Sequence, residues 1–282
     1  MSAPEGAGAG GARVASAARS LLAPNPGRMT LDGTRTWVLG VPGAGPAVVV
    51  DPGPDDEGHL RRVVRAAQEE HGGVALVVLT HHHADHTAGA ARLAALAGGA
   101  PVRAADPALQ TGVADGLPGL ADGDELDLPG GRLVVVAAPG HTRDSLCLLL
   151  EAPEQAPLLL TGDTVLGRGT SVVAHPDGDL GAYLATLGRL SALVHERGVA
   201  ALLPGHGPLV REPGAVLAWY AAHRRERLEQ VRAAVAGGAR TAADVVRAVY
   251  PGLAEDLRPA AERSSAAALE LLAAGGPGPV DA

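Results

Sequence analysis

Short apolar runs separated by turns predict the strands of this chain, and longer mixed stretches between them predict its helices. Runs rich in valine and leucine that are followed directly by turn residues are typical of buried strands. We expect strands at residues 36–41, 47–50, 74–79, 133–138, 146–150 and 158–160 and near residue 200, with helices at 57–71, 88–97 and 180–197.

These strands fall into two groups with helices outside them, which predicts an α/β fold, a four-layer αβ/βα sandwich. From Pro213 the pattern changes to helices alone, at residues 213–236, 241–250 and 254–272, with Thr241 and Asp244 as an N-cap pair. We expect a disordered segment at 1–12, a main domain at 13–212 and a small helical domain resembling a winged-helix module at 213–282.

One short segment directly after the third predicted strand holds four candidate metal ligands. The loop that leaves the carboxyl end of a strand is where α/β folds usually place their chemistry. His81 and His83 lie two residues apart, so on an extended segment they face the same side and can bind one ion. Asp85 and His86 can then turn toward a second ion, whereas His82 faces away.

Three later turns have the same character, because each contains glycine and follows an apolar run. Glycine lets the backbone turn sharply and approach a bound group closely. These turns are Pro139-Gly140-His141-Thr142, Thr161-Gly162-Asp163-Thr164 and Pro204-Gly205-His206-Gly207. Four strand ends are therefore expected to supply one site.

Together these segments resemble the metallo-β-lactamase superfamily, whose pattern is H-x-H-x-D-H followed by a distant His, Asp and His. Four motifs in this order argue against a solvated histidine loop or an adventitious metal site. The resemblance implies a first metal held by His81, His83 and His141, a second held by Asp85, His86 and His206, and Asp163 bridging the two. Zinc is the first expectation for both divalent ions, with manganese or iron as alternatives.

Further segments resemble the lactamase-β-2-like branch over residues 21–272: the sequence at 25–34, the sequence at 167–170, and Tyr220 with His223-Arg224. Aspartate at 163, where one branch of true lactamases has cysteine, also resembles the hydrolase branches. The branch includes a mitochondrial endoribonuclease specific for single strands, and related branches cleave thioesters. The resemblance implies hydrolysis of a small-molecule ester, thioester or lactone or, alternatively, of single-stranded RNA; a non-catalytic scaffold is a third reading, against which the complete ligand set argues.

The charge distribution favours the small molecule, because RNA binding normally needs a basic track. The chain carries a net charge of −8, and residues 219–282 contain eight arginines and eight acidic residues. Residues 273–279, where a wing is expected, contain no lysine, arginine or aromatic residue. We expect the tail to cover the site entrance or to pair subunits into a homodimer. We interpret the helix surface that carries Arg224, Arg225, Arg227 and Arg232 as a solvated face.

Composition adds little about chemistry. Phenylalanine and lysine are absent, which we read as GC-rich codon usage. The single cysteine, Cys147, excludes an internal disulfide and fits a buried strand. Residues 1–20 lack the apolar core of a secretion signal, and no run of about 20 apolar residues could cross a membrane, so we expect a cytoplasmic enzyme.

The resemblance also implies a mechanism. Two divalent ions about 3.5–4 Å apart lower the pKa of a bridging water, so that hydroxide is present near neutral pH. We expect Asp85 to orient that hydroxide and Asp163 to hold both ions in place. Asp51 and Thr80 are candidates to hydrogen-bond the ligand imidazoles, although a turn role for Asp51 is equally consistent with the sequence.

Five further residues are candidates for contacts around the site. His175 can serve as a general acid, but we prefer its interpretation as a turn residue before the helix at 180. Asn25, Thr34 and Arg35 border the mouth of the site by family resemblance. Arg35 and Arg168 are candidates to bind an anionic group of the substrate.

Overall fold

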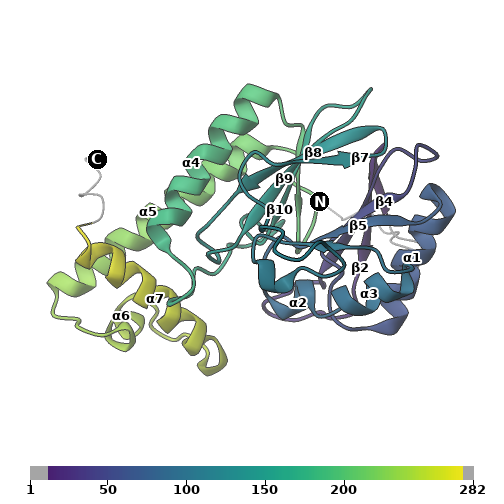
Figure 1. The fold of residues 1–282 in the computed structure, drawn as a ribbon. Helices are drawn as coiled ribbons and strands as arrows, with labels where there is room; N and C mark the ends of the chain where they lie inside the picture. Colours follow the sequence, from purple (N-terminus) through teal and green to yellow (C-terminus); the bar gives the residue numbers. More distant parts are fainter. Residues whose placement is uncertain (1–11, 276–282) are drawn as a thin grey trace.

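The computed structural model describes residues 12–275, which form two β-sheets with helices on their outer faces (Figure 1). The first sheet has the strand order β1-β2-β3-β4-β5-β6, with β1 Ala12–Ala15, β2 Ala18–Leu22, β3 Arg35–Leu39, β4 Ala47–Val50, β5 Val74–Val78 and β6 Val102–Arg103. The second has the order β11-β10-β9-β8-β7, with β7 Glu125–Leu128, β8 Gly131–Ala137, β9 Leu146–Glu151, β10 Leu158–Gly162 and β11 Ala201–Pro204. The pairs β4–β5, β5–β6 and β10–β11 are parallel, and the other pairs are antiparallel.

The helices connect the strands and extend the chain beyond the second sheet. They are α1 Glu57–His71, α2 Ala84–Thr87, α3 Ala90–Leu96, α4 Leu180–Arg197, α5 Pro213–Ala236, α6 Ala242–Val249 and α7 Arg258–Ala273, with short 3-10 turns at Pro107–Leu109 and Glu255–Leu257. Among residues 12–275, no helix is long and apolar enough to cross a bilayer.

Strand β4 shows how one short apolar run builds the layers. Side chains alternate between the two faces of a strand. Val48 and Val50 accordingly pack between the two sheets, whereas Ala47 and Val49 pack beneath the helical layer that contains Leu60 of α1. On the other side of the molecule a third cluster joins α4 to the outer face of the second sheet. The predicted four-layer αβ/βα sandwich is therefore confirmed.

The C-terminal helices share the core of the second sheet. Leu217 and Tyr220 of α5 belong to the same hydrophobic cluster as Leu159 of β10 and Leu187 of α4. The predicted N-cap pair at the start of α6 is confirmed, since Thr241 and Asp244 form a complete capping box. Residues 213–275 contain no strand, so the winged-helix resemblance rests on the helices alone.

Several predicted boundaries are confirmed and others differ. Helices α1, α4 and α5 have the predicted bounds, and Cys147 is buried in β9. The helix expected at 88–97 is α3, and the short helix α2 that precedes it was not expected. Helix α7 begins at Arg258 after a 3-10 turn, with a proline in its first turn. Strands β1, β2, β6 and β7 were not expected. The segment expected to be disordered, 1–12, lies outside the described residues except for Ala12, which begins β1.

Candidate metal centre

The candidate ligands lie at strand ends that meet at one edge of the sandwich. Asp51 follows β4, the histidine-rich segment follows β5, and Asp163 and His206 follow β10 and β11. The β4–β5 and β10–β11 pairs are parallel, so their carboxyl ends lie side by side. His141 follows β8 of the second sheet. The structure brings together all seven residues that the motifs singled out, in three overlapping groups whose ligand atoms lie within 4.8 Å of one another: His81, His83 and His141; His81, His86 and Asp163; Asp85, His86 and His206.

The first half of the centre, the histidine half, consists of His81, His83 and His141. Nε2 of His81 lies 3.0 Å from Nδ1 of His83, and Nε2 of His141 lies 3.1 Å from the same atom. Nitrogens that share a tetrahedral ion at about 2.0–2.1 Å lie about 3.4 Å apart, which is close to these separations.

The hydrogen bonds behind these rings fix which nitrogen faces inward. Nδ1 of His141 donates to the carbonyl of Val172 at 2.7 Å. The Thr80 hydroxyl donates to Asp51 at 2.8 Å, so it accepts from Nδ1 of His81 at 3.0 Å. The Nε2 atoms of His81 and His141 therefore both present lone pairs. Both face Nδ1 of His83, which can donate a hydrogen bond to only one of them. This donor set fits a cation at the centre of the three rings.

The second half, the carboxylate half, consists of Asp85, His86 and His206. Nδ1 of His86 donates to Asp51 at 2.8 Å, and Nδ1 of His206 donates to the carbonyl of Gly33 at 3.1 Å. Their Nε2 atoms face each other across 3.2 Å, and Oδ2 of Asp85 lies 3.1 Å from Nε2 of His206. Two imidazole nitrogens and a carboxylate at these separations fit a second divalent ion.

Asp163 lies between the halves. Its Oδ1 is 3.4 Å from Nε2 of His86, and its Oδ2 is 3.4 Å from Nε2 of His206 and 3.8 Å from Nε2 of His141. Oδ1 is buried and has no hydrogen-bond partner, a condition that costs about 1–3 kcal/mol or more unless another group satisfies the atom. An ion between the halves would satisfy it. Burial raises the pKa of Asp163, but the neighbouring His86 and His206 outweigh burial and hold it well below its usual range.

The two halves differ in proton affinity. Burial lowers the pKa of His83 to about 4 and that of His81 well below its usual value. Burial also acts on His206, but hydrogen bonds to Asp163 and Asp85 outweigh it and raise the pKa to about 9. The charges of Asp163 and Asp51 likewise raise the pKa of buried His86 well above its usual value. In the carboxylate half, protons and a metal ion compete for the same nitrogens.

Asp51 connects the two halves from behind. Its carboxylate accepts from the backbone N–H of Thr80 at 2.8 Å, from the hydroxyl of Thr80 at 2.8 Å and from His86 at 2.8 Å. Asp51 is almost fully buried and has a φ of 51°, a left-handed conformation that aspartate adopts more readily than most residues. One carboxylate thereby orients His86 directly and His81 through Thr80.

Two glycines allow the strand ends to approach this closely. A Cβ on Gly162 would lie 2.6 Å from Oγ1 of Thr80. A Cβ on Gly205 would lie 2.6 Å from Cε1 of His86 and 2.8 Å from Oδ1 of Asp163. A side chain at either position would displace groups of the metal centre.

Asn25, Thr34 and Arg35 support the centre through the backbone. The Asn25 amide holds Thr34 by two hydrogen bonds of 2.9 Å, and Thr34 pairs with His206 in an isolated bridge. The Arg35 side chain donates to the carbonyl of Gly207 at 2.5 Å and to the Ser20 hydroxyl at 3.2 Å. These contacts fix the segment against which His206 packs.

Three other singled-out residues lie outside the three ligand groups. His82 contacts Asp144 at 2.8 Å. Arg168 forms an exposed ion pair with Asp32 at 3.2 Å. His175 contacts Glu270 of α7 at 2.9 Å, which joins its loop to the tail.

One prediction about the tail is wrong. Arg224 was assigned to a solvated helix face, but it is buried: it donates to the carbonyl of Ser171, and its guanidinium lies 5.3 Å from the centre of the Tyr183 ring. Because Tyr183 and Ser171 are distant in sequence, nothing local in α5 indicates this burial. Ser171 and Val172, which contact Nδ1 of His141 at 3.1 and 2.7 Å, were not among the residues expected at the site.

The sequence model of the Metallo-beta-lactamase superfamily matches residues 29–278 of the chain. This chain belongs to the metallo-β-lactamase superfamily. Like its family, it is a hydrolase, and the residues gathered above suit the divalent metal ions that the family implies.

Relatives and solved structures agree with this membership. The lactamase-like protein vrtG of Penicillium aethiopicum is 34% identical over 244 residues, which cover 82% of this chain and 72% of that protein. The atrochrysone carboxyl ACP thioesterase of Aspergillus fumigatus is 28% identical over 249 residues, covering 84% and 74%. The beta-lactamase-like protein 2 homolog of Drosophila melanogaster is 29% identical over 264 residues, covering 88% and 85%. A beta-lactamase domain protein from Burkholderia ambifaria matches in structure with a TM-score of 0.74 and 25% identity, covering 95% of this chain and 90% of that one.

Proposed function

We propose that this chain is a binuclear zinc hydrolase that cleaves a small-molecule ester, thioester or lactone. The observation that carries the proposal is the convergence of inward-facing imidazole nitrogens and two carboxylates in adjoining halves, with Asp163 between them. Nitrogen and carboxylate ligands in this number suit zinc, and manganese or iron are the alternatives.

Two bound divalent ions would lower the pKa of a water and polarise the scissile carbonyl. The protein's own residues hold this arrangement in place. Asp85 is only partly buried, so its carboxylate can both face His206 and orient a reacting water from the open side. Asp51, Thr80, Gly33 and Val172 hold the histidine rings from behind, which keeps their inward nitrogens in position.

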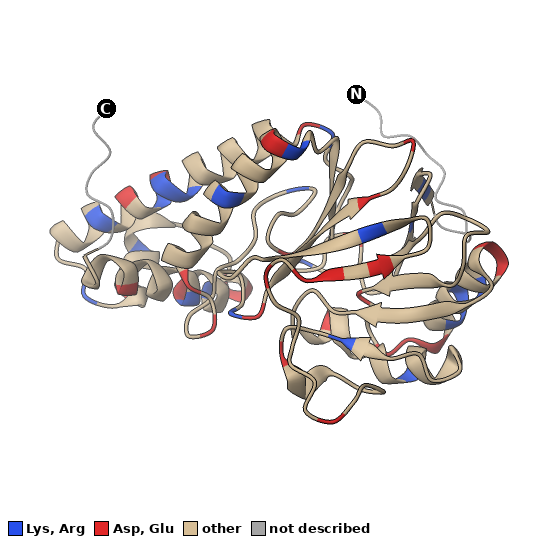
Figure 2. Ribbon diagram, turned by 45° about the horizontal axis from the view of Figure 1, so that its top comes forward, with Lys and Arg blue, Asp and Glu red and all other residues tan. Residues whose placement is uncertain are grey.

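Charge supports the small molecule over RNA. Basic and acidic bands are interspersed along the C-terminal helices (Figure 2). Arg224 is buried against Ser171, and the Arg232 side chain pairs with Glu229, so neither belongs to an open basic track. The relative named as an acyl carrier protein thioesterase adds support for an ester or thioester bond.

The test is a parallel assay of the full-length, metal-loaded protein on a panel of esters, thioesters and lactones and on labelled single-stranded RNA. We expect turnover of a member of the panel and intact RNA. Asp163→Ala should abolish turnover, whereas Asp144→Asn, which changes the contact of His82 outside the ligand groups, should retain it. RNA cleavage that depends on Asp163, without turnover of the panel, would contradict the proposal in favour of an endoribonuclease.

A further inference from the structure

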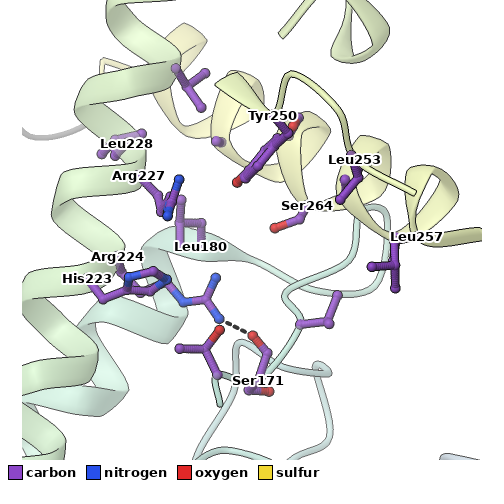
Figure 3. A pocket seen from close by; sticks show the side chains of 17 residues that line it. Ser171, Leu180, His223, Arg224, Arg227, Leu228, Tyr250, Leu253, Leu257 and Ser264 are labelled. Atoms are coloured by element: carbon purple, nitrogen blue, oxygen red, sulfur yellow. Dashed lines mark hydrogen bonds between the residues drawn. The ribbon is translucent and has the colours of Figure 1, made fainter. Parts of the chain in front are cut away.

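A pocket of about 260 Å³ lies between the C-terminal helices and the loop at 170–172, and we call it the tail pocket (Figure 3). Its walls are mostly apolar, with Leu180 of α4, Leu228 of α5 and Leu253 and Leu257 on the segment before α7. Ligand sites are usually apolar cavities of about 300–1,000 Å³ with a few polar groups. The tail pocket is slightly smaller than this range, so it suits one acyl chain or ring.

The two arginines that line the tail pocket are cationic, and none of the described residues that line it is acidic. Arg224 and Arg227 reach it from α5, opposite Tyr250 and Ser264 (Figure 3). The Arg227 guanidinium lies 5.4 Å from the centre of the Tyr250 ring and donates to the amide oxygen of Gln230 at 2.8 Å. Within residues 12–275 neither arginine forms an ion pair with a carboxylate.

Arg224 is the more informative of the two. It is 7% exposed, and its Nε atom is buried without a hydrogen-bond partner. A buried guanidinium that has no carboxylate is costly unless an anion joins it. Burial and the charges of Arg224 and Arg227 lower the pKa of His223, which also lines the pocket.

The tail pocket adjoins the metal centre through one loop. The carbonyl of Ser171 accepts from Arg224, while the hydroxyl of Ser171 and the carbonyl of Val172 contact His141. A molecule held at Arg224 therefore contacts the loop that positions His141, a candidate metal ligand.

We propose that the tail pocket binds the non-reacting end of the substrate, an apolar group that carries a carboxylate or a similar anion, with Arg224 and Arg227 as its partners. This inference rests on the proposed hydrolase function. It assigns the helical tail a role in substrate recognition.

Binding to the tail pocket can be measured without turnover. Trp219 is 51% exposed and stacks on His223, with ring centres 5.5 Å apart, whereas Trp37 is 2% exposed. We expect octanoate to bind saturably to the full-length protein and to change Trp219 fluorescence. Octanol, which lacks the charge, should bind at least about tenfold more weakly, since a hydrogen bond to a charged group accounts for at least that factor. Absence of saturable octanoate binding, or equal binding of octanol, would overturn the inference.

Three variants and a matched control locate the site. Arg224→Gln should weaken octanoate binding about tenfold or more, whereas Arg225→Gln, the exposed neighbour on the same helix, should not change it. Arg224 is buried and its replacement also affects folding, so Arg227→Gln and Ser264→Leu, which fills the cavity, provide the same test with less disturbance. Unchanged binding in both of these variants would contradict the assignment.

Kinetics connect the pocket to the reaction. Octanoate should inhibit hydrolysis competitively, and Arg227→Gln should raise KM for anionic substrates while kcat stays unchanged. Octanoate binding without competition would overturn the substrate assignment alone. Absence of all hydrolysis would instead contradict the proposed function. Octanoate binding, which is measured without turnover, would then show whether the tail pocket itself still binds an anion.

Discussion

The histidine half and the carboxylate half of the candidate metal centre are built from similar parts but have opposite proton affinities. In both, an imidazole is held through Nδ1 by the protein and presents Nε2 inward. Burial, together with the neighbouring histidines, lowers the pKa of His83 to about 4, whereas hydrogen bonds to Asp163 and Asp85 raise that of His206 to about 9 despite its burial. A carboxylate that strengthens binding of a metal ion thus also strengthens binding of the competing proton.

The largest effect is expected where the halves meet. Asp163→Ala removes the carboxylate that faces both, so turnover should fall by about 10³-fold or more, and bound metal should fall below two ions per chain. Steady-state kinetics and elemental analysis measure the two effects. Full activity in a correctly folded Asp163→Ala protein would remove Asp163 from the mechanism.

Replacing one candidate ligand in each half should separate the contributions of the two ions. His83→Ala and His206→Ala should each lose the ion of their own half, with a fall in turnover of about 100-fold or more. His82→Ala is the matched control, because that side chain contacts Asp144 and lies outside the three ligand groups. Loss of metal in the His82 variant equal to that in the other two would contradict the assignment of ligands.

Asp51 tests whether the halves share their support. Asp51→Asn should lower metal affinity about 10–100-fold, the usual effect of removing a group that orients a metal ligand. Asp56→Ala, which removes the N-cap of α1, should reduce stability by about 1 kcal/mol without changing metal affinity. Equal metal affinity in the Asp51 variant and the wild type would mean that Asp51 only shapes the turn.

The pH dependence of metal binding should also differ between the two halves. Because metal-free His206 has a raised pKa of about 9 and the pKa of His86 is also raised, an ion must displace protons at lower pH, and affinity in the carboxylate half should rise at least about tenfold per pH unit toward 9. In the histidine half, His83 has a pKa of about 4, so affinity should be nearly constant above about pH 5. Metal titrations of His206→Ala and His83→Ala across this range measure each half by itself, and identical pH profiles would contradict the comparison.

The candidate ligands could be identified from the sequence because each of them lies within a short motif at the end of an apolar strand. Parallel strands place such ends at one edge of a sheet, which the structure confirms for β5, β10 and β11. The partners of the ligands were less accessible. Val172 contacts His141 from 31 positions away, and Ser171 contacts Arg224 from 53, distances that local pattern cannot bridge.

The same contrast applies to the elements of the fold. The bounds of α1 and α4 follow from local caps, Asp56 and Gly72 for the first and Asp179 and Gly198 for the second, and were predicted. Strands β2 and β7 were missed, because the first contains arginine and serine and the second alternates acidic residues with leucine. Such short strands form because neighbouring strands complete their hydrogen bonds, which depends on the whole sheet.

The central claim is that two ions bind here in adjoining halves. Anomalous X-ray scattering from crystals of the zinc-loaded protein tests it most directly. We predict two peaks about 3.5–4 Å apart, one among His81, His83 and His141 and the other among Asp85, His86 and His206, with Asp163 contacting both. A single peak, or two peaks at other residues, would contradict the binuclear centre.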